Sequence, residues 1–442
     1  MLEISANLAH RPHIVIVGAG FGGLSAAKAL AKADADITLI DRRNHHLFQP
    51  LLYQVATAAL APNQIASPIR AIVRKQRNVS VILDEVLNVD RKNSQVILRD
   101  RAIAYDYLIL ATGAQHAYFG RDDWEDHAPG LKGLEDANLI REKILLAYER
   151  AELLPQGPER ERALSFVIIG GGPTGVELAG AIAELSKRAL ACDFRHTRCS
   201  DPRVVLIEAG PRLLPSFSEN ISAYVKRALE KRGVDVRLGR AVTDCADRKV
   251  IIGDELIEAD TVIWAAGVRA SPAAAWLAAP ADRAGRALVR ADLSIEGAPN
   301  VFVIGDTASA MGVDGKTVPG LAPAAKQQGA YVGALLRARI DGEPAPGPFR
   351  YMDFGSLATV GRNAAVAEFG GMKLTGFIAW LFWSAIHIYF LIGFRNRILV
   401  TLDWLWSYVT LERGARLITE SVSAHRAKER ADAVSMTAVA AE

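Results

Sequence analysis

Short apolar runs recur along the chain, and a glycine-rich turn directly follows two of them. The run at residues 14–17 precedes GAGFGG at 18–23, and the run at 166–169 precedes GGGPTG at 170–175. Such runs are typical of strands buried on both faces of a parallel sheet. Both turns match G-x-G-x-x-G, the pattern that joins a strand to a helix at a dinucleotide site. The pattern therefore predicts two strand–turn–helix units of this kind.

The glycines of this pattern have separate physical tasks. The first permits the tight turn, the second lets backbone approach a pyrophosphate, and the third allows close packing of helix on strand. The pyrophosphate then lies against the free N–H groups at the helix N-terminus. We assign these tasks, in order, to Gly18, Gly20 and Gly23 in the first unit and to Gly170, Gly172 and Gly175 in the second.

An acidic residue ends a later strand in each unit. Asp41 follows the apolar run at 37–40, and Glu208 follows the run at 204–207. A carboxylate at this position binds the hydroxyls of an adenosine ribose. One glycine match alone is weak evidence, but two matches with acidic partners are strong. The chain is therefore expected to bind two dinucleotides and to transfer electrons between them.

A second feature is also repeated. The strand at 105–110 ends in Ala111-Thr112-Gly113, and the strand at 260–264 ends in Ala265-Ala266-Gly267. Small residues there let backbone lie close to a nucleotide; a simple tight turn is the alternative. The strand at 301–304 ends at Gly305-Asp306 and is predicted to return to the first domain. The expected fold class is α/β, with two Rossmann-like domains, one split around the other. A helix at 134–154 and a polar linker at 155–162 lead into the inserted domain.

The C-terminal region changes in character. Residues 374–394 contain no Asp, Glu, Lys or Arg. This uncharged segment is long enough for a membrane span. A single span would separate the nucleotide domains from Arg395, Arg397, Arg413 and Arg416, although positive residues favour the cytoplasmic side. An interfacial helix avoids this conflict, and residues 398–411 place Ile398, Leu402, Leu405 and Val409 at helical spacing. We predict monotopic binding through helices at 346–420, with Trp380 and Trp383 in the lipid. A single span and an apolar dimer interface are the alternatives, and 421–442 is predicted to be a disordered tail.

Composition narrows the possibilities further. The chain has 442 residues, of which 50% are hydrophobic and 23% charged, so it is globular. A net charge of +3 gives no reason to expect a nucleic-acid partner. Cys192, Cys199 and Cys245 form no C-x-x-C pair, which argues against a cysteine-held cluster or metal site. The first residues lack a secretory signal, and the nucleotide domains are expected to face the cytoplasm.

Three further segments resemble one family. NHHLFQPLLY at 44–53, GLAPAAKQQG at 320–329 and IGFRNR at 392–397 are similar to the type II NADH:quinone oxidoreductases, which are flavoproteins with two dinucleotide-binding domains. The resemblance covers roughly residues 12–420. It implies non-covalent FAD, NADH as donor, a membrane quinone as acceptor and no proton pumping. The implied layout is a FAD domain at 1–125 and 281–345, an NADH domain at 126–280 and a membrane-associated C-terminal segment on the cytoplasmic face of the plasma membrane.

The resemblance also implies roles for single residues. Glu177 matches a glutamate near the contact of nicotinamide and flavin; the alternative is an acid in the first helical turn that complements the helix dipole. Gln327 matches the second glutamine of an A-Q-x-A-x-Q motif at the quinone site, whereas Pro323 replaces the first and cannot donate a hydrogen bond. The FAD residues are Gly18, Gly20, Gly23, Asp41, Thr112, Gly113, Asp306 and Ala324, and the NADH residues are Gly170, Gly172, Gly175, Glu208 and Gly267.

Related flavoproteins give the competing hypotheses. A disulfide reductase needs a cysteine pair near the flavin, and residues 45–69 contain no cysteine. A sulfide:quinone oxidoreductase also uses flavin-proximal cysteines, whereas Cys192 and Cys199 fall in an expected loop remote from the flavin. A sensing or interaction module with slow NADH oxidation is the other alternative. A homodimer is compatible with the apolar C-terminal surface.

Overall fold

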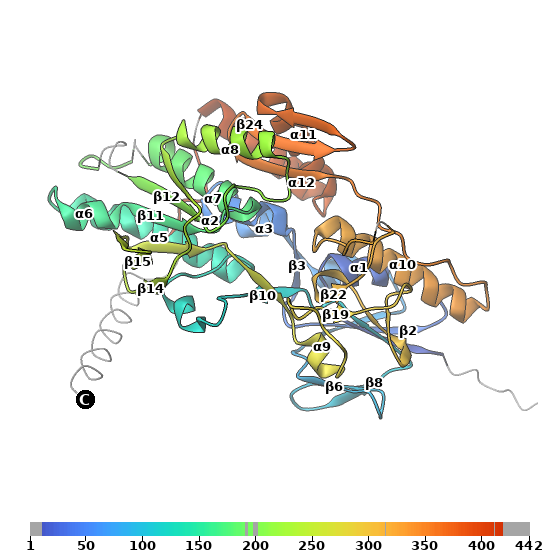
Figure 1. Cartoon of the computed structure of the whole chain (residues 1–442). Helices are drawn as coiled ribbons and strands as arrows, with labels where there is room; N and C mark the ends of the chain where they lie inside the picture. The colour runs from blue at the N-terminus through green and yellow to red at the C-terminus, as the bar shows by residue number, and fades with distance from the viewer. Residues whose placement is uncertain (1–10, 191–192, 198–201, 314, 411, 419–442) are drawn as a thin grey trace, which may run out of the picture.

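The computed structural model describes residues 11–190, 193–197, 202–313, 315–410 and 412–418. Cys192, Cys199 and the tail at 421–442 lie outside these residues. Two open sheets, each with its own helices, form the two halves of the molecule, and a smaller sheet with two helices covers one of them (Figure 1).

The first half is built on a six-stranded sheet. Its strands, in spatial order, are β20 (Ser294–Ile295), β21 (Ala298–Val303), β9 (Tyr107–Leu110), β1 (His13–Val17), β2 (Asp36–Asp41) and β5 (Val79–Leu83). All neighbours are parallel except β20 and β21. Because β21 pairs with β9, the chain does return to this sheet after completing the second half, as the sequence predicted. Helices α1 (Phe21–Ala29) and α10 (Ala322–Asp341) pack side by side on it (Figure 1).

The second half repeats the centre of the first. Its parallel sheet has the order β13 (Val234–Leu238), β12 (Arg203–Glu208), β11 (Ser165–Ile169) and β17 (Thr261–Trp264). In both sheets the strand before the glycine turn lies between the strand that ends in an acid and the strand that ends in the small-residue triplet. The repeat seen in the sequence is therefore a structural repeat.

Helices complete this half. They are α5 (Leu134–Leu153), α6 (Pro158–Ala163), α7 (Pro173–Glu184) and α8 (Glu219–Glu230). The helix predicted at 134–154 is confirmed. The linker predicted at 155–162 is wrong in part, because Pro158 stands in the first turn of α6, where a missing N–H costs no hydrogen bond.

The smaller elements connect these parts. They are β3 (His45–Leu47), α2 (Leu52–Ala56), α3 (Pro62–Ile65), β4 (Ala66–Pro68), α4 (Ile69–Val73), β6 (Asn88–Asp90), β7 (Gln95–Ile97), β8 (Ala102–Ala104), β10 (Ala114–His116), β14 (Asp244–Ala246), β15 (Lys249–Ile252), β16 (Glu255–Glu258), β18 (Val268–Ala270), α9 (Ala273–Trp276), β19 (Ala287–Leu288) and β22 (Ala308–Ser309). Strands β10 and β18 pair with each other and so tie the two halves together.

The C-terminal part consists of β23 (Ser356–Gly361), β24 (Ala364–Phe369), β25 (Met372–Thr375), α11 (Gly376–Phe390) and α12 (Phe394–Thr410). Its contact with α7 is unusually close, since a Cβ added to Gly180 would lie 1.9 Å from the carbonyl oxygen of Val360. The uncharged segment at 374–394 is not one helix, because it begins in β25, continues as α11 and leaves the helical conformation before α12. Among the described residues, no helix combines the length and the hydropathy needed to cross a bilayer.

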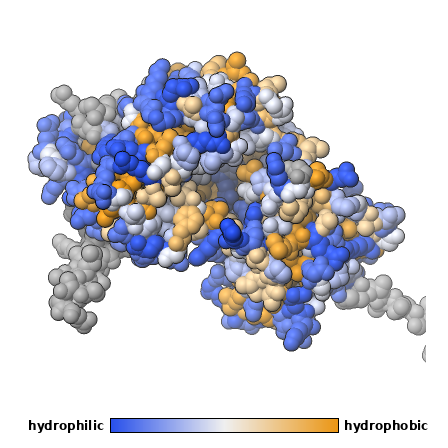
Figure 2. Space-filling model, in the orientation of Figure 1, coloured by the Kyte–Doolittle hydropathy of each residue, from blue (hydrophilic) through white to orange (hydrophobic). Residues whose placement is uncertain are grey.

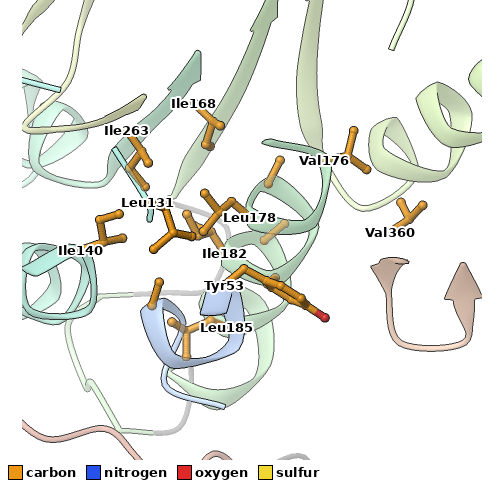
Figure 3. Close-up of a cluster of buried hydrophobic side chains, with 14 of the residues drawn as sticks. Tyr53, Leu131, Ile140, Ile168, Val176, Leu178, Ile182, Leu185, Ile263 and Val360 are labelled. Atoms are coloured by element: carbon orange, nitrogen blue, oxygen red, sulfur yellow. The ribbon is translucent and has the colours of Figure 1, made fainter. Parts of the chain in front are cut away.

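The C-terminal helices contribute to the core of the second half. Trp383 is 2% exposed and Val400 is fully buried, and both belong to the hydrophobic cluster that contains Ile182 and Tyr53. The prediction that Trp383 lies in lipid is therefore wrong. Hydropathy does not distinguish a side chain that faces protein from one that faces lipid. Figure 3 shows this cluster, with the ring of Tyr53 packed beside α7 and its hydroxyl pointing away from the apolar side chains.

Candidate active site

The two glycine turns have the same geometry. Gly18 and Gly170 have positive φ angles of 98° and 115°, and a Cβ at either would meet the backbone of the small-residue triplet within 2.5 Å. A Cβ at Gly23 or Gly175 would lie 1.8 Å from the carbonyl oxygen of the first glycine of its own turn. These positions admit only glycine.

The second glycine of each turn is different. A Cβ at Gly20 or Gly172 would meet no protein atom within 4 Å, and both residues have ordinary negative φ angles near −70°. The protein itself therefore does not require glycine at these two positions. Open space beside backbone N–H groups at a helix N-terminus is what a pyrophosphate needs, so both turns fit a bound dinucleotide.

The acidic partners hold these turns in place. Asp41 accepts hydrogen bonds from the N–H groups of Ala19, at 2.6 Å, and Arg43, at 2.7 Å. Glu208 accepts the equivalent pair from Gly171, at 2.5 Å, and Gly210, at 2.6 Å. Each carboxylate thus lies at the turn where a ribose would bind. Their contact with ribose stays a prediction.

We expect a strong preference for NADH over NADPH. The negative charge of Glu208 opposes a 2′-phosphate, and the guanidinium of Arg212 is bound to the carbonyl oxygens of Phe217 and Pro215 rather than free to offset it. In Glu208→Gln the NADH affinity should fall about ten- to a hundredfold, the equivalent of about 1.5–3 kcal/mol for a hydrogen bond to a charged group. The affinity for NADPH should fall much less. Titration of both nucleotides into the variant and into the parent protein measures the ratio of the two affinities. An unchanged ratio in the variant would contradict the role given to Glu208.

Residues distant in sequence form hydrogen bonds with one another beside the first sheet. Thr112 lies 2.5 Å from the hydroxyl of Ser271, which lies 3.0 Å from that of Thr307, next to Asp306. Gln328 is 2% exposed and accepts a hydrogen bond from the N–H of Gly305 at 2.6 Å. Sequence reasoning missed Ser271 and Gln328, because nothing in the local pattern indicates either contact.

A cavity of about 130 Å³, here named the Lys132 cavity, lies between the halves. The lining comes from the first half through Gln49, Leu52 and Tyr53, from the connection through His116, Leu131 and Lys132, and from the second half through Thr174, Glu177, Trp264, Ala265, Gly267 and Val268. It brings the predicted residues Glu177 and Gly267 together, whereas Asp306, Ala324 and Gln327 are not among its walls. Burial lowers the pKa of Lys132, and the negative charge of Asp306 opposes this effect.

Glu177 is the acid that lines this cavity, and its side chain is partly exposed. Its carboxylate accepts one long hydrogen bond, 3.5 Å from the N–H of Thr359. Burial raises its pKa from 4.5 to about 8, since the charged form is poorly solvated there. Helix α7 begins at Pro173 and has no acid in its first turn. The alternative of a first-turn acid at the helix dipole is therefore wrong.

Gln327 forms two hydrogen bonds with the backbone of one residue, Met352. Its amide nitrogen donates to the carbonyl oxygen of Met352, and its amide oxygen accepts from the Met352 N–H, both at 2.9 Å. These bonds attach the segment before β23 to α10. Pro323 stands in the first turn of the same helix, where its missing N–H leaves no bond unmade. Contact of Gln327 with a quinone stays a prediction.

The end of α11 lies against two of the three family-like segments. The ring of Phe48 contacts His387 of α11 edge-on, with centroids 6.2 Å apart, and the ammonium of Lys326 lies 4.7 Å above the ring of Phe390. Asn396 approaches the hydroxyl of Ser67 at 3.5 Å. The end of α11 therefore closes over the start of α10 and the segment at 44–53.

Cys245 is the one cysteine that lies within the described residues, and it is buried in the second half. Burial raises the pKa of its thiol to about 11, which keeps it protonated and unreactive.

Comparison with known proteins agrees with this geometry. Residues 12–329 match the family described as pyridine nucleotide-disulphide oxidoreductase, and residues 354–410 match the NDH2 C-terminal domain. The type II NADH:quinone oxidoreductase Ndh of Mycobacterium tuberculosis is 43% identical over 95% of this chain and 92% of its own. NdhA of the same organism is also 43% identical, over 93% of this chain and 90% of its own.

Solved structures share the fold. The NDH2 of Plasmodium falciparum, solved in complex with NADH, superposes with a TM-score of 0.82 at 22% identity and covers 93% of this chain and 100% of its own. The sulfide:quinone oxidoreductase of Aquifex aeolicus gives a TM-score of 0.70 at 21% identity, over 91% of this chain and 96% of its own. The fold alone thus does not separate these activities, but the sequence relatives do: the chain belongs to the type II NADH:quinone oxidoreductases.

Proposed function

We propose that this protein oxidises NADH and passes the two electrons through FAD to a quinone at a membrane surface, without pumping protons. The observation that carries the proposal is the Lys132 cavity, because it lies between two dinucleotide turns of the same geometry and is lined from both halves. Family membership supports NADH as donor and a quinone as acceptor. Non-covalent FAD and the absence of pumping are expected from the family.

The residues present can hold both nucleotides. Gly20 and Gly172 leave room for the two pyrophosphates, while Asp41 and Glu208 stand at the ribose positions. Bound FAD would accept electrons from the nicotinamide and release them to the quinone. The chain's own contribution is to hold the rings together, to exclude water, and to place Lys132 and Glu177 beside them.

Stopped-flow spectroscopy tests the proposal directly. Mixing the FAD-loaded protein with NADH should bleach the flavin absorbance, and mixing the reduced protein with a quinone analogue should restore it at a rate that supports turnover. Slow bleaching by NADH would favour a sensing module, and reduction by sulfide but not by NADH would favour a sulfide:quinone oxidoreductase.

The quinone is proposed to bind beside Gln327, where α10, α11 and the segment at 44–53 meet. In Gln327→Ala the reoxidation of reduced flavin should slow about three- to tenfold, as expected for one neutral hydrogen bond of roughly 0.5–1.5 kcal/mol. Reduction by NADH should be nearly unchanged. Because Gln327 also binds Met352, a fall in Tm with both half-reactions intact would mean that its role is only structural. Pro323→Gln should tighten quinone binding.

Membrane attachment is proposed to use the exposed face of α11 and α12. Figure 1 places α11 at the top of the molecule, and Figure 2 shows apolar surface there. The exposed apolar residues on them are Phe377, Ile378, Leu381, Tyr389, Phe390, Phe394, Ile398, Leu402, Leu405, Trp406 and Val409. The four positions predicted at helical spacing on α12 are all among them, so they do share an exposed face.

We expect Leu402→Ser/Leu405→Ser to weaken binding to lipid vesicles about ten- to a hundredfold. Each leucine, 55% and 60% exposed, loses at most about 1.5 kcal/mol of apolar burial. Leu153→Ser is the matched control, because Leu153 is 82% exposed on α5, away from this face. High salt should release little protein. Normal vesicle binding together with loss of a dimer in light scattering would favour the apolar dimer interface instead.

Truncation is a poor test of this attachment. Removal of residues from 372 onward would delete Trp383 and Val400 from the core and would expose their partners. The orientation proposed for the intact protein places the nucleotide halves in the cytoplasm, where NADH is formed. A homodimer is compatible with the same face.

A further inference from the structure

A second cavity, of about 120 Å³, lies behind the first and is named here the tryptophan cavity. Tyr53 and Glu177 line both cavities and so form the wall between them. On α7, Ala181 and Glu184 continue the same helical face into the second cavity. Trp383 of α11 and Ser407 of α12 close its other sides.

The chemistry of these walls calls for hydrogen-bond acceptors inside the cavity. Trp383 is 2% exposed, and its indole N–H has no partner among the described residues; the same is true of the Nε of Arg362. Buried donors of this kind are normally satisfied by ordered water. The volume is sufficient for several water molecules, since each needs roughly 10–15 Å³ of such space.

Tyr53 is placed to connect these waters with Glu177. Its hydroxyl oxygen accepts a hydrogen bond from the amide of Gln54 at 2.9 Å, and Gln54 in turn accepts from the indole of Trp404 at 2.8 Å. The hydroxyl proton of Tyr53 is therefore directed elsewhere. Figure 3 shows the hydroxyl pointing out of the apolar cluster.

The far end of the cavity is charged and partly exposed to solvent. Glu184 is 19% exposed, lies 3.8 Å from Arg413 and accepts the N–H of Arg362 at 2.6 Å. The guanidinium of Arg362 lies over the ring of Tyr408. Tyr408 belongs to α12, whose other face is exposed and apolar.

We propose that the tryptophan cavity holds a chain of water molecules that brings a proton from the rim at Glu184 to Glu177. The inference rests on the proposed function. Hydride from NADH carries two electrons and one proton, and reduction of a quinone to a quinol takes up two electrons and two protons. The balance NADH + H⁺ + quinone → NAD⁺ + quinol therefore requires one proton from solvent in each turnover. The raised pKa of Glu177 allows it to hold this proton near neutral pH. Because Glu177 also lines the Lys132 cavity, it would release the proton there to the reduced flavin, which would transfer it to the quinone together with the two electrons.

Ala181 offers a test that leaves every charge in place. Ala181→Leu should fill much of the cavity, and Ala181→Ser is the matched control, which keeps the side chain small. In the FAD-loaded protein, proton uptake is followed with a pH-indicator dye in weak buffer after mixing with NADH and then with a quinone analogue. We expect uptake and flavin reoxidation to slow at least about tenfold in the leucine variant, with a larger solvent isotope effect, and to be unchanged in the serine variant.

A second readout does not depend on turnover. Infrared difference spectra report the protonated carboxyl of Glu177 as a function of pH. Loss of water beside it should raise its pKa further in Ala181→Leu. The groups that face it are Tyr53 from α2, Thr359 from β23, Glu184 along α7, and Lys132 and His116 across the first cavity; all are unchanged in the variant.

The outcomes separate the two proposals. Wild-type protein that is neither reduced by NADH nor reoxidised by the quinone analogue would overturn the proposed function. Normal wild-type half-reactions with unchanged uptake and isotope effect in a folded Ala181→Leu protein would overturn only the water chain. If that variant does not fold, Ser407→Leu fills the cavity from α12, with Ser407→Ala as control, and is expected to give the same slowing. A lipid or quinone extracted from wild type but absent from the filled variants would also overturn the proposal.

Discussion

A methyl group added at Gly23 or at Gly175 is expected to destabilise the half of the molecule that carries it more than any other single change considered. In both cases the new Cβ would lie 1.8 Å from a backbone carbonyl oxygen, and backbone cannot move aside as a side chain end can. Overpacking typically costs about 1–3 kcal/mol and more where nothing yields. At the upper end of that range, about 3 kcal/mol, a half of this size should lose about 6–12 °C in Tm, measurable by calorimetry on Gly23→Ala and Gly175→Ala.

The second glycine of each turn supplies the matched control. Gly20→Ala and Gly172→Ala place the methyl group in open space at a permitted φ, so the Tm should be as in the parent. Gly20→Ala should lose FAD and Gly172→Ala should lose affinity for NADH, because the methyl group occupies the space required by a pyrophosphate. Full retention of both nucleotides by these two variants would show that the phosphates bind elsewhere.

Stability should fall as the pH rises from about 4.5 to about 8, and Glu177 should account for much of this. Its pKa is raised from 4.5 to about 8 by burial. Below this window both the folded and the unfolded chain hold the proton; within it only the folded chain does. The stability contributed by the proton is therefore fully present at low pH and is lost as the pH approaches the folded pKa, with a limiting slope of about 1.4 kcal/mol per pH unit.

Urea unfolding of the FAD-loaded protein at a series of pH values measures this slope. Glu177→Gln cannot titrate and should remove it. Glu296→Gln, whose side chain is 79% exposed, should leave it as in the parent. Equal pH dependence in the parent and in Glu177→Gln would show that Glu177 is ionised in the folded protein, and would remove its role as a proton carrier as well.

The sequence predicted the parts of the fold that neighbouring residues determine. Each turn is specified within six residues, and the acid that supports it follows on the next strand, so both units and their repetition could be recognised directly. The return of residues 301–304 to the first domain was also predicted, from their place after the second unit, and β21 does pair with β9 there. The contacts of Ser271 and Gln328 could not be found in this way, since their partners are 36 and 23 residues away along the chain and are brought close only by tertiary packing.

The C-terminal helices show the limit most clearly. Trp383 and Leu381 stand in the same uncharged segment, yet one is 2% and the other 49% exposed. Residue type alone favours burial for both, whether in protein or in lipid. What separates them is the position of α11 against β24 and α12, and the continuous apolar run gave no information about it. Lys132 was missed for the opposite reason, because an isolated lysine in a sequence is most often at the surface.

The close approach of α7 to β23 has a consequence for comparing relatives. With the Val360 carbonyl 1.9 Å from where a Cβ would stand, position 180 admits only glycine while the C-terminal sheet is docked. In a flavoprotein that lacks this sheet, nothing limits the side chain at the corresponding place on the helix. A larger residue there is therefore expected to mark lineages in which the C-terminal part was lost or docks differently. Because position 180 lies five residues after the last glycine of the second turn, it can be found in a short fragment by that motif alone. The residue there would then indicate whether the C-terminal sheet is docked, even in a fragment that does not contain it.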